Sequence, residues 1–271
     1  MRDHLSIWVT MNFTNEQMAY LRSHLSERLH QERRVAPHGQ GAMARVQQWT
    51  SEPARHCVTL AHEHYPGVLR LLHDAPLVLY GLGCWSVFDK PALAIVGSRQ
   101  CSAPARALAF ELGREVASRG WCVVSGLARG VDAAAHRGAL ASGARASTIA
   151  VLGNGLDVIY PPEHQELADQ IHRMQGLLLT EFALNEPPLA HHFPQRNRLV
   201  ACLSRGTVVV QAQQRSGSMI TAGLAADMGR EVFAVPGLPG DPRVAGTHAL
   251  LRQGATLVEN VGDIWQAFGL P

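Results

Sequence analysis

The sequence predicts an α/β fold in which a doubly wound, mostly parallel sheet carries a small helical region before it. Short apolar runs without alternation, such as Leu93–Val96 and Ile149–Leu152, indicate strands that are buried on both faces. Each run ends in a turn with glycine or serine and precedes a segment with helical spacing, the order typical of this class. Hydrophobic residues make up 46% and charged residues 17% of the 271 residues, as in a globular protein with a large core.

The N-terminal region, residues 1–64, predicts a helical appendage. Apolar residues recur at three- and four-residue steps between Met18 and Leu29, which favours an amphipathic helix. The proline and glycines within Val35–Gly41 end it. Further short helices are expected over Ala42–Trp49 and Val58–His64.

The main domain is expected over residues 65–271 and begins with a short buried strand at Leu77–Gly81. The next strand is Leu93–Val96, after which a glycine breaks the run. Ser98 and Ser102 can cap the segment that follows, and Ala105–Arg119 has the spacing of a helix.

The rest of the chain repeats the alternation of strand and helix. Strands are expected at Trp121–Val124, Thr148–Leu152, Leu177–Thr180, Thr207–Val210, Glu231–Val235 and Thr256–Val258, and helices at Ala133–Leu140, Pro162–His172, Met219–Met228, Gly246–Arg252 and Val261–Phe268.

Small polar residues and arginines follow several of these strands. The carboxyl ends of parallel strands face one rim, where such domains bind ligands. Backbone N–H groups at helix starts attract anions, and arginine adds a planar set of donors. The candidate binding residues are Gly97, Ser98, Arg99, Ser125, Gly126, Arg129, Ser216, Gly217 and Ser218. Asp132 is expected to cap its helix and His136 to pack inside.

The segment from Pro187 to Leu203 is the most distinctive. Pro194 suits the first turn of a helix, which would place Arg196, Asn197 and Arg198 in that turn. Cations at a helix N-terminus oppose the helix dipole, and an anionic ligand would explain them. Phe193 precedes them as a possible stacking platform.

Other patterns argue against several classes of site. Lys90 is the only lysine, so any anion site must use arginine. Gly153-Asn154-Gly155 resembles half of a dinucleotide fingerprint, but Val158 and the prolines after Tyr160 break it. No metal cluster, nucleophile with a base or carboxylate pair is recognisable, so no cofactor and no catalytic residue is expected.

The five cysteines are scattered, and no signal peptide or membrane-length apolar run precedes the domain, which predicts a reduced cytoplasmic protein. Phosphate donors beside an aromatic residue, without a catalytic set, suit a protein that binds single-stranded nucleic acid. A nucleotide-sized ligand fits the same residues, so both remain open on the residues alone.

The chain from about Tyr65 to Phe268 resembles the DprA/Smf family of DNA-processing proteins of bacterial transformation. The matching motifs, in family order, are Tyr65-Pro66, Ala94–Arg99, Ser125–His136, Val151–Asp157, Tyr160-Pro161, Phe193–Arg198, Ser216–Ser218 and Val235–Gly237. The resemblance implies an extended Rossmann-like fold, a homodimer, single-stranded DNA binding without sequence preference, and loading of RecA recombinase onto incoming DNA in natural transformation. It implies no enzymatic activity.

The resemblance also implies roles for single residues. Arg99 is expected to hold phosphate, Phe193 to stack a base, and Arg196 to Arg198 to shape the pocket. A C-terminal winged-helix-like domain, common in the family, is not expected because the chain stops at Pro271. The alternative is a nucleotide-binding enzyme of the lysine-decarboxylase-like phosphoribohydrolase class, although the segment at Ser216–Thr221 lacks the glutamate that those enzymes carry.

Overall fold

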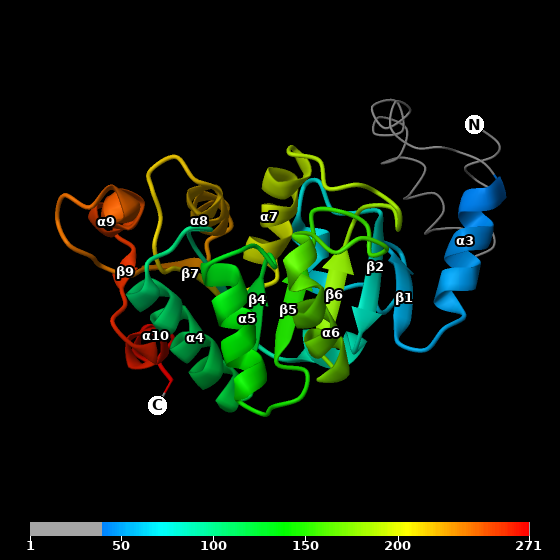
Figure 1. Ribbon diagram of the computed structural model, residues 1–271, viewed down its shortest axis with the longest axis horizontal. Helices are drawn as coiled ribbons and strands as arrows, with labels where there is room; N and C mark the ends of the chain where they lie inside the picture. Colours follow the sequence, from blue (N-terminus) through cyan, green and yellow to red (C-terminus); the bar gives the residue numbers. More distant parts are fainter. Residues whose placement is uncertain (1–39, 271) are drawn as a thin grey trace.

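One mixed sheet forms the centre of the protein, for which the computed structural model describes residues 40–270 (Figure 1). Its nine strands are β1 (Arg55–Thr59), β2 (Val78–Gly83), β3 (Ala92–Val96), β4 (Cys122–Ser125), β5 (Thr148–Val151), β6 (Leu177–Thr180), β7 (Gly206–Val209), β8 (Glu231–Ala234) and β9 (Thr256–Leu257). Their spatial order is β1-β2-β6-β5-β4-β3-β7-β8-β9. In this spatial order, every neighbouring pair from β6 through β5, β4, β3, β7 and β8 to β9 is parallel. Strand β2 is antiparallel to both β6 and β1. The predicted mostly parallel sheet is confirmed.

Helices cover both faces of this sheet, as in a doubly wound fold (Figure 1). One face carries α4 (Ala103–Ser118), α5 (Val131–Ala141), α6 (Gln165–Arg173) and α10 (Val261–Ala267); the other carries the 3-10 turn Gly67–Leu71, α7 (His192–Cys202), α8 (Gly217–Asp227) and α9 (Ala245–Arg252). The helix α3 (Gln40–Thr50) lies beside β1 at the edge of the sheet.

The central strand β3 shows why the chain becomes exposed at the rim formed by the strand ends. Ala92, Ala94 and Val96 pack into the core on the side of α7, whereas Leu93 and Ile95 pack on the side of α4. All five are buried, because consecutive side chains of a strand point to opposite faces and both faces are covered. The chain therefore reaches solvent only where the strand ends.

The prediction of a helix over Val58–His64 is wrong. Arg55–Thr59 is the strand β1, which pairs with β2 so that Cys57 lies opposite Tyr80. Pairing at the edge of a sheet outweighs a weak local preference for helix. The expected helix over Ala42–Trp49 is confirmed within α3, and the one between Met18 and Leu29 lies outside the described residues.

Strand β1 thus joins the sheet from before residue 64, where the sequence placed the domain boundary. The division into two domains at that point remains a prediction. Within residues 40–270, no helix has the length and apolar character needed to cross a membrane.

Helix α7 starts earlier than the sequence suggested. Its first helical residue is His192, so Pro194 does lie in the first turn, where its missing N–H costs nothing. Arg196 and Arg198 lie beyond that turn. The expectation that these cations oppose the dipole of the helix N-terminus is therefore wrong, because the dipole effect is confined to the first turn.

Candidate functional site

A groove of about 1290 Å³ opens at the carboxyl ends of β3, β4 and β7, beside the N-terminal halves of α7 and α8. It is the rim at which the sequence placed the site. The residues that line it include Gly97, Ser98, Arg99, Gly126, Arg129, Asp132, Phe193, Arg196, Asn197, Arg215, Ser216, Gly217 and Ser218.

The turn after β3 brings Arg99 to the groove. The N–H of Ser98 donates to the carbonyl of Gln211 at 2.7 Å, and the N–H of Gln100 donates to Ser98 Oγ at 3.1 Å. A Cβ on Gly97 would lie only 2.6 Å from the side chain of Val131, so glycine lets the turn pack directly on the start of α5. These contacts hold the backbone and leave the Arg99 side chain exposed.

Two arginines of the groove carry charge that the rest of the described chain does not neutralise. Within residues 40–270, neither Arg99 nor Arg215 makes a hydrogen bond or ion pair, and both side chains are exposed. Arg129, by contrast, is paired with Glu163, and Arg243 with Asp241. Arg99 and Arg215 are therefore available to an anion.

The guanidinium of Arg99 lies over the ring of Phe193, 5.6 Å from its centroid. Phe193 is half-buried. Its ring also contacts the ring of Tyr160, with 5.6 Å between the two ring centroids. A Cβ on Gly153 would come within 2.9 Å of this ring, so the glycine makes room for it. Cation and aromatic ring thus share one end of the groove.

Arg196 forms part of the groove floor rather than an exposed contact. Its Nη1 donates to the carbonyl of Gly126 at 2.8 Å and also to the carbonyl of Val151. These two carbonyls belong to the ends of neighbouring strands, so one buried guanidinium bridges β4 and β5. A Cβ on Gly126 would lie 2.5 Å from Arg196 Nη2, so a residue with a side chain there would displace it.

Asp132 completes this floor. One of its carboxylate oxygens accepts the N–H of Gly126 at 3.1 Å. Burial raises the pKa of Asp132, while the nearby Arg196 opposes that shift. Burial lowers the pKa of Arg196 to about 10, so the guanidinium stays protonated at neutral pH. Asp132 is the second residue of α5, and its carboxylate binds the turn before the helix rather than capping the helix as expected.

Asn197 connects the two helices that flank the groove. Its Oδ1 accepts a bond from Arg196 Nε at 3.3 Å, and its Nδ2 donates to the carbonyl of Gly217 at 3.2 Å. Ser216 is the N-terminal cap position of α8. Its buried Oγ has no hydrogen-bond partner among the described residues.

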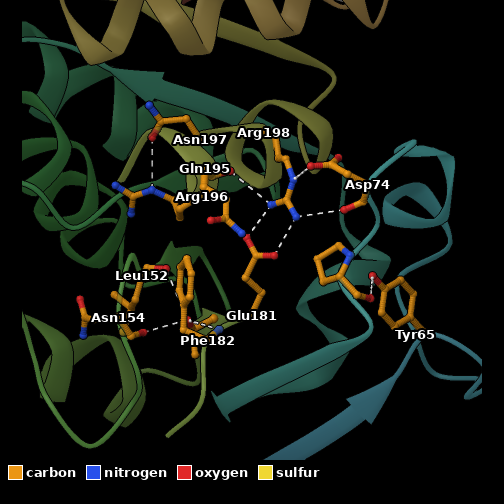
Figure 2. Close-up of polar contacts among 12 residues, drawn as sticks. Tyr65, Asp74, Leu152, Asn154, Glu181, Phe182, Gln195, Arg196, Asn197 and Arg198 are labelled. Carbon is orange, nitrogen blue, oxygen red and sulfur yellow. Dashed lines mark hydrogen bonds and ion pairs between the residues drawn. The ribbon is translucent and has the colours of Figure 1, made fainter. Parts of the chain in front are cut away.

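The structure removes two predicted residues from the groove. The Oγ of Ser125 is buried and donates to the carbonyl of Ile95 at 2.7 Å, inside the sheet. Arg198 points away from the groove and is paired with Asp74 and Glu181 (Figure 2). Its charge is neutralised within the protein, so it is not available to an outside anion.

Sequence reasoning missed one groove residue, Arg215, and one residue that supports the groove, Gln211. Arg215 stands one residue before the predicted Ser216–Ser218 motif and is exposed. Gln211 binds the turn after β3 twice, through its carbonyl to Ser98 N–H and through Oε1 to the N–H of Ser102 at 2.8 Å. Its position two residues after β7 is the one sequence signal that it carries.

The described residues contain no group of three or more histidines, cysteines and carboxylates that could hold a metal ion. His136 is fully buried and its Nδ1 lies 2.7 Å from Thr148 Oγ1, which confirms that it packs inside. The groove therefore combines two unneutralised arginines, the N-terminus of α8 and one aromatic ring, a set that can bind a phosphate chain with an unpaired base.

Known proteins are similar to this chain in sequence. The sequence profile of the family described as DNA recombination-mediator protein A matches residues 56–269. Protein Smf of Escherichia coli is 42% identical over 224 residues, which cover 82% of this chain but only 59% of that protein. DNA processing protein DprA of Streptococcus pneumoniae is 43% identical over 204 residues, 75% of this chain and 71% of that protein.

Two solved structures are similar over most of the chain. The X-ray structure of DNA processing protein A from Streptococcus pneumoniae has a TM-score of 0.75 at 32% identity and covers 98% of this chain and 97% of that one. A structure that describes the single-stranded DNA binding mode of DNA processing protein A from Helicobacter pylori has a TM-score of 0.70 at 32% identity. The match covers 79% of this chain and 95% of that one.

Proposed function

This chain belongs to the DNA recombination-mediator protein A family, and from that premise we propose that its groove binds single-stranded DNA without sequence preference. The observation that carries the proposal is the pairing of the unneutralised Arg99 with the half-buried ring of Phe193, 5.6 Å away, in a groove that the N-terminus of α8 also lines. The charge suits a phosphate, and the ring suits an unpaired base.

Single strands fit this arrangement better than duplex DNA. A ring inside a groove can stack only on a base that is free of its complementary strand. Backbone donors and arginines track phosphates and do not read base edges, which is why no sequence preference is expected. The similarity to a Helicobacter pylori protein whose structure describes single-stranded DNA binding supports the same assignment.

The test is a titration of labelled oligothymidine with the full chain, followed by anisotropy at about 50 and about 200 mM salt. We expect tight binding that weakens with salt, at a slope of about −0.7 per phosphate neutralised. Unlabelled single strands of any composition should compete, and duplex of equal length should compete poorly. A salt-independent affinity, or equal competition by duplex, would contradict the proposal.

We further propose that the protein acts in natural transformation in the cytoplasm, where it protects incoming DNA and loads RecA recombinase onto it as a homodimer. The name of the family supports the mediator role. Strand exchange on DNA coated with single-strand-binding protein tests it: RecA alone should be slow, and this chain should restore the rate. No stimulation despite DNA binding would refute the loading step, and sedimentation as a monomer would refute the dimer.

We propose that the protein works by binding rather than by catalysis. The competing assignment, hydrolysis of a nucleoside monophosphate at the same rim, predicts release of free base from nucleotides. Incubation with each monophosphate and chromatography of the products would reveal that reaction. Turnover that Phe193→Ala abolishes would replace the binding proposal with the enzymatic one.

A further inference from the structure

Every N–H group of the Arg198 guanidinium has an acceptor. Nε donates to Asp74 Oδ2 at 2.6 Å and Nη2 to the carbonyl of Asp74 at 3.0 Å. Nη1 and Nη2 donate to the two carboxylate oxygens of Glu181 at 2.5 and 2.7 Å, and Nη1 also donates to the carbonyl of Gln195 at 3.2 Å. Since arginine has five such donors, the set is complete.

This cluster is mostly buried. The side chains of Arg198 and Glu181 are 9% and 8% exposed, whereas that of Asp74 is 45% exposed. Buried ion pairs contribute little net stability, because the lost hydration of both charges offsets their attraction. A bidentate pair does, however, define the orientation of both side chains. The intact cluster is therefore expected to define geometry more than stability, whereas removal of one partner leaves a buried charge unpaired and destabilises the protein.

The cluster ties α7 to the antiparallel side of the sheet. Glu181 directly follows β6, and Asp74 lies in the loop before β2. Figure 2 shows Arg198 reaching both of them on one side of α7, while Arg196 and Asn197 leave the helix on the other. Because successive helical residues differ by about 100° around the axis, holding Arg198 also sets the rotation of the whole helix.

Phe193 lies on the same helix, four residues before Asn197 and on the same face, so it depends on that rotation. We propose that Arg198 is a positioning residue: bound by Glu181 and Asp74, it holds α7 at the rotation that places the ring of Phe193 in the groove. This inference rests on the proposed binding of single-stranded DNA.

One substitution distinguishes this role from simple electrostatics, because the two predict opposite changes in DNA affinity. Glu181→Gln removes a negative charge near a site for a polyanion, so electrostatics alone would tighten DNA binding. The positioning role gives the opposite result, because glutamine cannot accept both N–H groups of Arg198. Glu166→Gln is the control: Glu166 also pairs with an arginine, Arg173, but both side chains are exposed and lie on α6, on the opposite face of the sheet from α7.

The experiment measures the dissociation constant for oligothymidine of the full chain and its variants, with melting temperatures alongside. We expect Glu181→Gln to weaken binding about fivefold or more, the low end of one lost base stack, and Glu166→Gln to leave it unchanged. Unchanged or tighter binding by a folded Glu181→Gln would overturn the inference. Absence of binding by the wild type would instead refute the proposed function itself.

Two further variants keep the test decisive. Asp74→Asn alters the exposed member of the cluster and should weaken binding in the same direction by less, which covers the case in which Glu181→Gln does not fold. In a Phe193→Ala background, Glu181→Gln should cost little additional affinity, because its effect passes through that ring. Fully additive losses would show that the cluster affects binding independently of Phe193, and would overturn the inference.

Discussion

Replacing Arg99 with alanine should separate binding from stability. The side chain is exposed and, within residues 40–270, makes no hydrogen bond or ion pair. Its contact with the ring of Phe193 is of the exposed cation–π kind, worth about 0.5–1 kcal/mol. Removing Arg99 also relieves its repulsion of the buried Arg196. These effects oppose each other, so the free energy of unfolding should change by less than about 0.5 kcal/mol.

The expected loss of DNA affinity is much larger. A charge-assisted hydrogen bond to a phosphate contributes about 1.5–3 kcal/mol. The dissociation constant for oligothymidine should therefore rise by roughly 10- to 150-fold. One phosphate contact fewer should also flatten the dependence of log K on log salt by about 0.7.

The assay is anisotropy of labelled oligothymidine at several salt concentrations, with urea unfolding as the measure of stability. Arg145→Ala is the control, because Arg145 is exposed and lies just before β5, at the opposite end of the strands. It loses the same charge and should change the affinity by no more than about twofold. Equal losses in both variants would refute a specific phosphate contact at Arg99.

Three other predictions concern the groove and the core. Phe193→Ala should cost about 1–3 kcal/mol of binding with an unchanged salt slope, since the ring carries no charge; a loss confined to melting temperature would make it a core residue. Glu163→Gln frees Arg129 from its ion pair and should tighten binding relative to Glu166→Gln, so unchanged affinity would count against Arg129 as a DNA contact. Burial lowers the pKa of His136 to about 3, so the unfolded chain takes up this proton first on acidification. The free energy of unfolding should fall by about 1.4 kcal/mol from about pH 7.5 to about pH 5.5 on this account. Urea titrations in which the His136→Gln variant keeps the full pH dependence of the free energy of unfolding would disprove the role of His136.

The interior of the fold could be predicted because each buried strand appears in the sequence as a short, continuous apolar run. Runs such as Leu93–Val96 are apolar at every position, and the structure buries them on both faces. The strand β1 could not be predicted in this way. Its residues have no strong periodicity, and their state is decided by pairing with β2, about twenty residues later in the chain.

The location of the candidate site was also within reach of the sequence. Turns that follow parallel strands must meet at one rim, and Arg99 and Phe193 do line one groove there. Arg215, which lines the same groove, was passed over because an exposed arginine in a loop has no distinctive pattern.

The two arginines of the Arg196–Arg198 motif show what only the tertiary structure decided. Arg196 and Arg198 stand two positions apart, so they project in different directions from the same helix. The first meets strand-end carbonyls beneath the groove, and the second meets the carboxylates of Asp74 and Glu181. The sequence by itself determined the doubly wound class and the rim, because buried strands and turn residues are local signals. Which arginines remain free for a ligand depends on partners that lie 17 to 124 residues away in the chain, and only folding brings those partners together.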